Sequence, residues 1–215
     1  MIKFSNCIPV ALMLATLVGC NVGIKGSGVS KTESRNVADF KSVSSEAVGD
    51  VNVTIGDSQS VEVTMDDNLL PLLVTEVVDG ELKIRTTGSF STSIGLKVNV
   101  TTPSLDSIHS SGVGNIKIEG LDSEQFAVGL SGVGGVTAKG KVQNLDVTVS
   151  GVGSANLREL LAENVSVTVS GVGGTEVYAS KWVNASTSGV GSITVFGSPA
   201  EKKENKSGIG SIKFE

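Results

Sequence analysis

The chain has 215 residues, of which 39% are hydrophobic and only 4% aromatic, and 27 of them are glycine. Its formal net charge of −5 at pH 7 argues against nucleic acid or anionic lipid headgroups as the main partner, because both favour clustered Lys and Arg. The sequence also lacks the HExxH, GxSxG and CxxC patterns of common catalytic sites. We therefore expect a protein that is not an enzyme and that binds no cofactor, no metal and no nucleic acid.

Residues 1–19 form a predicted signal peptide. Lys3 precedes an apolar run from Ile8 to Val18, which is too short to cross a bilayer as a mature helix. The run ends in Leu17-Val18-Gly19-Cys20, which resembles the lipobox of bacterial lipoproteins. The resemblance implies cleavage before Cys20 and lipidation of Cys20, so we expect a membrane anchor of acyl chains. An ordinary secretory signal in which Cys20 is incidental is the alternative.

Cleavage would change the composition of the mature chain. It removes Lys3 and no acidic residue, which makes the formal net charge −6, and it also removes Cys7. With Cys20 acylated, no thiol remains for a disulfide or for redox chemistry. Asn21 replaces the aspartate that retains some Gram-negative lipoproteins in the inner membrane, so we favour the outer membrane, with the protein facing the periplasm or the surface. We expect residues 20–31 to be a lipidated tether and residues 32–215 to be a single domain.

Weak traces of a repeat begin early in the chain. The segment 42–53 aligns without gaps on residues 107–118, which lead into the first clear repeat, and this predicts a degenerate additional coil. Between the two segments we expect a strand over 60–65 and a hairpin at Asp79-Gly80. Irregular terminal coils are expected in a solenoid, because its open end would otherwise expose strand edges.

An acidic cluster lies inside this irregular part. We expect a short helix over residues 67–73, interrupted by Pro71, with Asp66 and Asp67 as its N-caps. The oxygen-bearing side chains of Asp66, Asp67 and Asn68 also leave a calcium site open as an alternative. The nonapeptide of calcium-binding β-rolls is absent, which makes the capping role the preferred interpretation.

The dominant feature of the sequence is a repeated tetrapeptide. Ser-Gly-Val-Gly starts at residues 111, 131, 150, 170 and 188, and Ser-Gly-Ile-Gly starts at 207, with spacings of 18 to 20 residues. Before the motifs at 131, 150, 170 and 188 apolar residues alternate with small or polar ones, as in Val165, Val167 and Val169, which is typical of a strand with one buried face. The period and the alternation predict an all-β, right-handed β-helix-like solenoid with coils of about 19 residues.

We predict that the tetrapeptide is the corner of each coil. The apolar alternation is expected to slip by one residue there, so that the glycines turn the chain while the central residue fills the bend as part of a buried column. The serines should form an external column that caps backbone groups. The corner residues are Gly112, Val113, Gly114, Gly132, Val133, Gly134, Gly151, Val152, Gly153, Gly171, Val172, Gly173, Gly189, Val190, Gly191, Gly208, Ile209 and Gly210.

Several other segments occur in a fixed order along the chain. They are Gly26-Ser27-Gly28, residues 40–43, 49–54, 66–71 and 75–77, Asp79-Gly80, and residues 82–84. Together with the repeated tetrapeptide they resemble the bacterial head GIN domain family, which is labelled "putative auto-transporter adhesin" and has no established function. The resemblance covers roughly residues 26–215. It implies a β-helix-like domain on a cell surface or in the periplasm, and it brings no catalytic or binding residues. Because no membrane barrel follows residue 215, we do not expect a self-exporting autotransporter.

The aromatic residues and the single histidine are the candidates for a functional site. Tyr178 and Phe196 occupy the same repeat column on adjacent coils, and Trp182 lies in the connection between them. Aromatic rings beside hydroxyl groups suit a sugar-binding surface, but the preferred interpretation is that they cover the flank of the solenoid near its C-terminal cap. The single histidine, His109, is expected on the surface, because no carboxylate is placed by the sequence to orient it.

The leading hypothesis for the function is a membrane-anchored, non-enzymatic module that contacts glycans or envelope proteins through a rigid lateral face. The alternative is a structural or sensory envelope lipoprotein that acts through one protein partner, for example by strand addition at an exposed edge. A polysaccharide-active β-helix enzyme comes third, and it would require carboxylates and basic residues that converge on one lateral groove. The sequence leaves the oligomeric state open.

Overall fold

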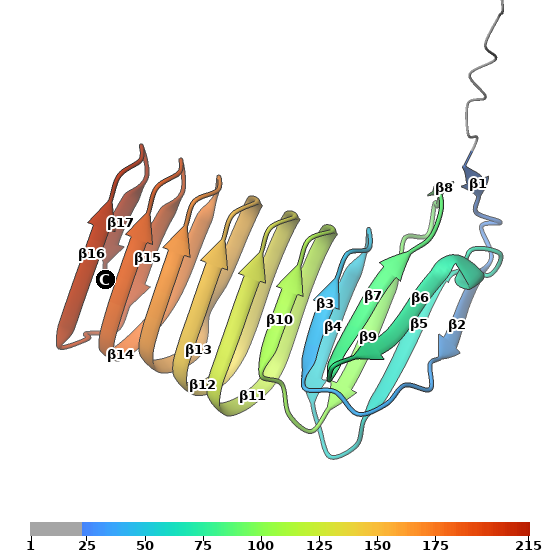
Figure 1. Cartoon of the computed structure of the whole chain (residues 1–215), viewed down its shortest axis with the longest axis horizontal. Coiled ribbons are helices and arrows are strands. Elements are labelled where there is room, and N and C mark those ends of the chain that lie inside the picture. Colours follow the sequence, from blue (N-terminus) through green and yellow to red (C-terminus); the bar gives the residue numbers. More distant parts are fainter. Residues whose placement is uncertain (1–22) are drawn as a thin grey trace, which may run out of the picture.

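The computed structural model describes residues 23–215, which coil into a β-solenoid of about five turns with about 20 residues per coil. Figure 1 shows the coils stacked side by side along the long axis, with the irregular N-terminal part at one end and the C-terminus at the other. The predicted all-β solenoid is therefore confirmed. No helix of residues 23–215 is both long and apolar enough to cross a membrane. The predicted signal peptide, Cys20 and Asn21 lie outside the described residues.

The elements follow one another in this order: β1 (Ile24–Lys25), β2 (Ser30–Ser34), β3 (Ser42–Ser45), β4 (Asp50–Ile55), β5 (Ser60–Asp66), the 3₁₀ helix η1 (Leu70–Leu72), β6 (Leu73–Val78), β7 (Glu81–Thr86), β8 (Phe90–Ser91), β9 (Lys97–Thr102), β10 (Ser107–Ser110), β11 (Val113–Leu130), β12 (Val133–Val149), β13 (Val152–Val169), β14 (Gly174–Thr187), β15 (Ser192–Phe196), β16 (Glu201–Lys206) and β17 (Ser211–Phe214).

Each regular coil has two faces joined by two bends. The long strands β11 to β13 run down one face, bend, and return up the other, and neighbouring coils pair in parallel register. One bend is the tetrapeptide corner, which we call the corner edge. The other bend is marked by register shifts near residues 118–121 and 137–140, and we call it the lower bend. Inward side chains from the two faces meet in a single core.

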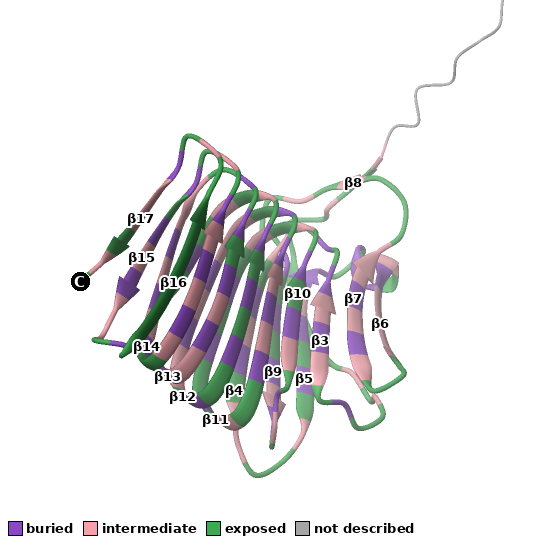
Figure 2. Cartoon of the chain, turned by 60° about the vertical axis from the view of Figure 1, so that its left-hand side comes forward, coloured by how far each residue is buried: buried purple, intermediate pink, exposed green. Residues whose placement is uncertain are grey.

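The core consists of aliphatic columns. Val128, Val147, Val167 and Ala185 lie opposite one another on successive coils, and all four are buried. Burying a valine side chain contributes roughly 1.5 kcal/mol or more, and the columns repeat this gain on every coil. Figure 2 shows the resulting stripes of buried residues running across the strands.

The degenerate coil lies where the sequence alignment predicted it. Ser107 pairs with Ser42, and Ile116 pairs with Val51, so segment 42–53 stacks directly on the first regular coil. The strand over residues 60–65 is confirmed as β5, and the hairpin is confirmed between β6 and β7, with φ values of 53° at Asp79 and 76° at Gly80. Antiparallel pairs β2–β5 and β5–β9 cover this end of the solenoid.

The helix expected over residues 67–73 is only the three-residue 3₁₀ turn η1. Its N-cap is Leu69, with no side-chain cap, so the predicted capping role of Asp66 and Asp67 was wrong. Both carboxylates are used instead to hold the segment around Ser27, as described below. The part of residues 20–31 that the structure describes is therefore packed on the domain, where β1 pairs with β8 and β2 with β5.

The valine column at the corners was predicted to be buried, and this prediction was wrong. Val113, the least exposed of the six central corner residues, is 46% exposed, and Ile209 is 86% exposed. Leu130 and Val136, the inward residues before and after the second corner, are six positions apart, so the alternation passes through the corner without a slip. Val133, at an odd step between them, must therefore point outward.

The glycines occupy the inside of the corner. A Cβ built on Gly132 would overlap the carbonyl oxygen of Gly112 on the preceding coil, so no other residue fits without displacing the backbone. Gly134 has a φ of 140°, a conformation that residues with a side chain rarely adopt. The corner thus turns tightly because its two inward positions have no side chains. The serines are exposed as expected, and the Ser131 hydroxyl donates to the carbonyl of Ser110 at 3.4 Å.

Candidate binding surface

A groove of about 560 Å³ lies on the lateral face that includes β10, close to the lower bend, and its volume falls in the range of small-ligand sites. Residues from β11 to β14, with Asp106 just before β10, form its walls and floor. The lining residues are Asp106, Ser123, Glu124, Gln125, Phe126, Ala127, Asn144, Leu145, Asp146, Asn164, Ser166 and Trp182.

One wall of the groove is a column of amides that ends in an aromatic ring. Gln125, Asn144, Asn164 and Trp182 are paired in register on four successive coils. The Asn164 amide nitrogen donates to the side-chain oxygen of Asn144 at 3.0 Å, and the Asn144 nitrogen donates to the backbone oxygen of Glu124 at 3.3 Å. These bonds fix the amide orientations and leave the exposed polar atoms of the column facing solvent.

A second column lies two residues further along the same face. It contains Ala127, Asp146 and Ser166, again in register. The surface is hollowed at the Ala127 end of this column. Ala127 has a small side chain there, and the neighbouring side chains of Phe126 and Leu145 are buried in the core. An elongated ligand with hydroxyl groups and an apolar face fits along the groove, between the amide column and the Asp146 carboxylate, with the Trp182 ring at the opposite end from Ala127.

Trp182 is partly exposed and is the only tryptophan of the chain. It follows the lower bend of β14 and stands beside Asn164 on the neighbouring coil. The structure therefore places this predicted residue in a groove with defined polar neighbours.

Tyr178 and Phe196 are brought together as predicted, since they pair in register between β14 and β15. They do not share the groove of Trp182. The Arg158 guanidinium lies over the Phe196 ring at 4.1 Å from its centroid, which covers that ring with a cation–π contact. Tyr178 lines a separate hollow at the lower bend with Lys141 and Glu163. The predicted three-residue aromatic site is thus divided into two places.

Several ion pairs lie on the surface of the lower bend. Lys139 pairs with Glu159 of the next coil at 2.9 Å, and Lys181 pairs with Glu163 at 2.7 Å. The hydrogen bond from Lys139 to Glu159 raises the pKa of the lysine, and the hydrogen bond from Lys117, together with its charge, lowers the pKa of Glu119. All of these groups are largely exposed, so they add little to stability.

A second polar cluster fixes the N-terminal segment. Asp66 is fully buried by the protein around it, and its carboxylate accepts hydrogen bonds from the Gly28 N–H at 2.7 Å and from the Thr92 hydroxyl. Both hydrogen bonds lower the pKa of Asp66, and the bond from Thr92 has the larger effect. Ser27 donates its hydroxyl to Asp67 and its N–H to the side-chain oxygen of Asn68. A Cβ on Gly26 would lie 2.5 Å from the Asp66 carboxyl carbon, which explains the small residue there.

The oxygens that a calcium ion would need at Asp66 and Asp67 are therefore bonded to the protein itself. Within residues 23–215, no group of three or more His, Cys, Asp and Glu side chains could hold a metal ion. His109 is exposed and lies opposite Gly129 on the next coil. The groove of Trp182 has three carboxylates, of Asp106, Glu124 and Asp146, but its lining includes no lysine or arginine.

Sequence reasoning missed the polar residues of the groove. Asn144 and Asn164 recur at a spacing of 20 residues, the same period as the corners, and this was the available signal. It was hidden because a polar outward residue is the default on any solvent-facing strand.

Taken together, the described residues define a two-faced parallel β-solenoid with a lateral polar groove that ends in a tryptophan. The chain belongs to the family described as "Putative auto-transporter adhesin, head GIN domain", whose model matches residues 39–199. This confirms the family resemblance of the sequence motifs. No curated protein matches the chain.

Solved structures with the same fold were found. A "putative adhesin" from Bacteroides fragilis is 26% identical with a TM-score of 0.76, over 90% of this chain and 100% of that one. A "putative adhesin" from Parabacteroides merdae is 18% identical with a TM-score of 0.52, over 90% and 99%. A "putative lipid binding protein" from Parabacteroides distasonis is 21% identical with a TM-score of 0.52, over 89% and 99%. The last two show the fold alone.

Proposed function

We propose that this protein is a lipid-anchored, non-enzymatic module of the bacterial envelope that binds glycan chains in the groove of Trp182. The family description and the name of the Bacteroides fragilis relative support an adhesin-like surface or envelope role. The anchor at Cys20 and a place in the outer membrane are supported by the lipobox-like end of the apolar segment and by Asn21.

The observation that carries the glycan proposal is the register of Asn144, Asn164 and Trp182. A rigid solenoid holds the two amides and the indole ring in a row, with neighbours about 4.8 Å apart. Sugars combine an apolar ring face, which stacks on an aromatic side chain, with hydroxyls that need donors and acceptors at fixed places. A row that repeats coil by coil suits a polymer, because one chain can contact several coils and gain affinity from each.

The test is a glycan array probed with the mature protein and with two variants. Trp182→Ala should lose at least about tenfold in affinity for the glycans that the native protein binds, since the ring provides the stacking surface. Phe196→Leu is the matched control, because this ring lies outside the groove and is covered by Arg158, and it should bind as the native protein does. Equal losses in both variants, or binding unaffected by Trp182→Ala, would contradict the proposal.

The alternative of one protein partner docking by strand addition has a specific place in the structure. It would use the free edge of the last coil, where β16 pairs only with β14. All six residues of β16, Glu-Lys-Lys-Glu-Asn-Lys, are exposed. A charged edge strand opposes the pairing of a further strand, so this feature favours the groove over the edge. A pulldown that recovers one envelope protein, with an array that shows no bound glycan, would reverse the order.

A further inference from the structure

We propose that the corner edge of the solenoid rests on the surface of the bilayer in which the protein is anchored. The inference rests on the proposed acylation of Cys20 and adds an orientation to it. The solenoid axis would lie parallel to the membrane, with the lower bend and the groove of Trp182 turned away from it.

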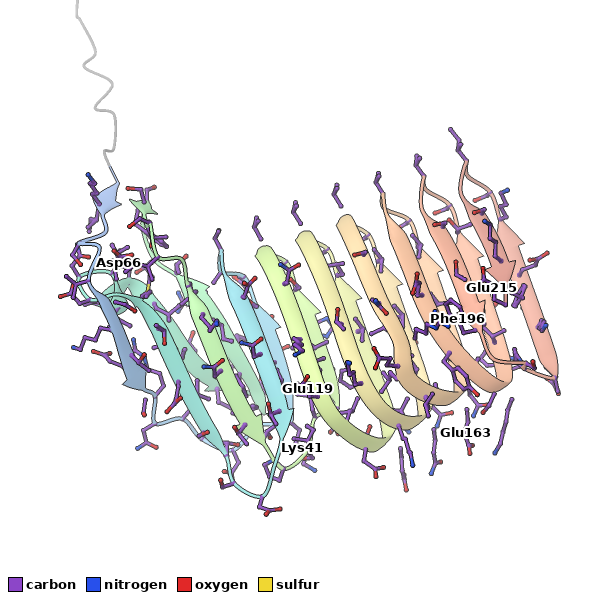
Figure 3. All side chains as sticks on the ribbon, turned by 180° about the vertical axis from the view of Figure 1, so that it is seen from behind. Lys41, Asp66, Glu119, Glu163, Phe196 and Glu215 are labelled. Atoms are coloured by element: carbon purple, nitrogen blue, oxygen red, sulfur yellow. The ribbon has the colours of Figure 1, made fainter. Side chains whose placement is uncertain are left out.

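The first support is a continuous apolar ridge along the corner edge. It consists of Val48, Val113, Val133, Val152, Val172, Val190 and Ile209, every one of which is exposed. Val113, Val133 and Val152 pair in parallel register, and bridges join Val48 to Val113 and Val152 to Val172. Figure 3 shows a row of side chains projecting from the corner of each successive coil. Solvent-exposed valines at every coil of one edge have no role in the core, whose inward positions at the corners are glycines.

The second support is the distribution of charge between the two edges. The five-residue segments that start at each corner serine, 111–115, 131–135, 150–154, 170–174, 188–192 and 207–211, contain no charged residue. Only the degenerate corner has charges, at Glu46 and Asp50. The lower bend carries the opposite pattern, with Glu119, Asp122, Glu124, Lys139, Lys141, Arg158, Glu159, Glu163 and Lys181. Figure 3 places Glu163 at the edge opposite the projecting row.

The absence of charge along the regular corners indicates which kind of surface the ridge can contact. Serine, glycine and valine can enter the boundary between headgroups and acyl chains at low cost, whereas charged side chains cannot. Because the corner segments carry no basic residues, contact with the bilayer would depend on apolar insertion and would not require anionic lipids.

The third support is the position of the chain leading to Cys20. Strand β1, which starts at Ile24, pairs with β8 at the same edge of the molecule as the corners, as Figure 1 shows. The backbone carbonyl of Leu96, a few residues after β8, accepts a hydrogen bond from the backbone N–H of Asp50. Asp50 follows Gly49 in the corner of the degenerate coil. Ile24, at the start of β1, and Ile94, shortly after β8, are also exposed.

The reach of the chain makes this position significant. Cys20 precedes Ile24 by four residues, which span at most about 14 Å when fully extended. The hydrogen bonds of Asp66 and Asn68 to residues 25–28 fix the segment that follows. Acyl chains on Cys20 would therefore hold this end of the ridge beside the membrane, and the rest of a rigid solenoid would need only to tilt onto it.

A second copy of the chain is the other occupant to consider for the ridge. Stable protein interfaces bury about 800 Å² on each partner and have a broad, complementary core. The ridge has one apolar side chain per coil, flanked by serines and glycines, so its apolar surface is narrow and lacks the breadth of a stable protein interface. A fluid bilayer accommodates a narrow ridge, whereas a second folded surface would need matching flanks.

The experiment uses the full chain, processed in a bacterial host, purified and reconstituted into vesicles of phosphatidylethanolamine and phosphatidylglycerol. Cys7 is lost with the signal and Cys20 is acylated, so a cysteine introduced at Val152 or at Lys141 is the only free thiol. Each variant receives an environment-sensitive fluorophore, and lipids with a nitroxide on the acyl chain act as quenchers. Lys141→Cys is the matched control on the lower bend, since Lys141 is also exposed.

We expect the nitroxide lipids to reduce the emission of the label at Val152→Cys by about twofold or more, and that at Lys141→Cys hardly at all, because docked apolar side chains reach about 5–10 Å into the interface. Adding Val133→Thr and Val172→Thr, which keep the β-branched shape, should weaken the quenching at Val152→Cys. Equal quenching at both labels, or none at either, overturns the inference. Self-quenching at Val152→Cys without nitroxide quenching would assign the ridge to a second copy instead.

The mass of the N-terminal peptide separates this inference from the proposal beneath it. If Cys20 is acylated and the label at Val152→Cys is not quenched, the orientation fails while the anchor stands. If Cys20 carries no acyl chain, the proposed anchor fails and the orientation fails with it.

Discussion

Gly132 lies directly against the carbonyl oxygen of Gly112 on the preceding coil, in a contact that leaves no space for a methyl group. The same relationship recurs between Gly151 and Gly132 and between Gly171 and Gly151. The corners therefore set how closely successive coils approach, and the repeated glycine is a requirement of stacking.

The first prediction compares the two central residues of one corner. Gly132→Ala should lower the free energy of unfolding by roughly 2 kcal/mol or more, because the new Cβ must push the coils apart. Val133→Ala should change it by no more than about 0.5 kcal/mol, since Val133 is 49% exposed. Thermal and denaturant unfolding of the two variants measure the difference. A loss from Val133→Ala as large as that from Gly132→Ala would contradict this account, because it would mean that the valine is packed as closely as the glycine.

The second prediction concerns acid. The pKa of Asp66 is lowered in the folded state, mainly by the Thr92 hydroxyl and also by the Gly28 N–H. Its contribution to docking the N-terminal segment is therefore complete above the ordinary carboxyl pKa of about 3.9 and is lost as the pH falls through the lower, folded value. Amide hydrogen exchange at Gly28 and in β2 should be slow at neutral pH and should accelerate, relative to the core strands, below about pH 4.

Asp66→Asn is the matched variant for the acid prediction. It keeps the shape of the side chain and cannot ionise, so exchange at Gly28 should already be faster at neutral pH and should show no additional acid-dependent step. If the native protein keeps full protection of β2 at pH 2, or if Asp66→Asn shows the same acid-dependent step as the native protein, then the carboxylate does not hold this segment.

The third prediction separates the two aromatic places. Arg158→Ala removes the cation over the Phe196 ring and should cost about 0.5–1 kcal/mol of stability, as is usual for such contacts at the surface. Binding in the groove should be unchanged, because neither residue lines it. Unfolding experiments and the glycan array provide the two readouts. A large loss of glycan binding in Arg158→Ala would contradict this separation and would mean that Phe196 and Trp182 belong to one site.

Local sequence patterns suffice to predict the regular coils of this solenoid. Period-two alternation and the spacing of the tetrapeptide predicted the coils, and the gap-free alignment of residues 42–53 predicted the pairing of Ser42 with Ser107. These features repeat, so each coil confirms the interpretation of the next. Val133 was misplaced because an apolar residue between glycines was assumed to be buried, although the six-residue step from Leu130 to Val136 required it to face outward.

The roles of Asp66 and Trp182 depended on contacts that the sequence does not contain. Asp66 binds Gly28, which lies 38 residues earlier, and only the antiparallel strands at the N-terminal end bring the two together. Trp182 was identified as a candidate for its chemistry, but its neighbours Asn164 and Asn144 come from other coils. A shift of the strand register by one residue would have turned the Trp182 side chain to the other face of the strand and away from these amides.

The most direct test of the proposed function uses the only tryptophan of the chain as its own reporter. Because Trp182 lines the groove, a glycan that binds there must change the intrinsic tryptophan emission. Titration with a glycan found on the array should give a saturable change in emission with the same affinity as direct binding by calorimetry. A glycan that binds by calorimetry while the emission of Trp182 stays constant would contradict the claim that this groove is the binding site.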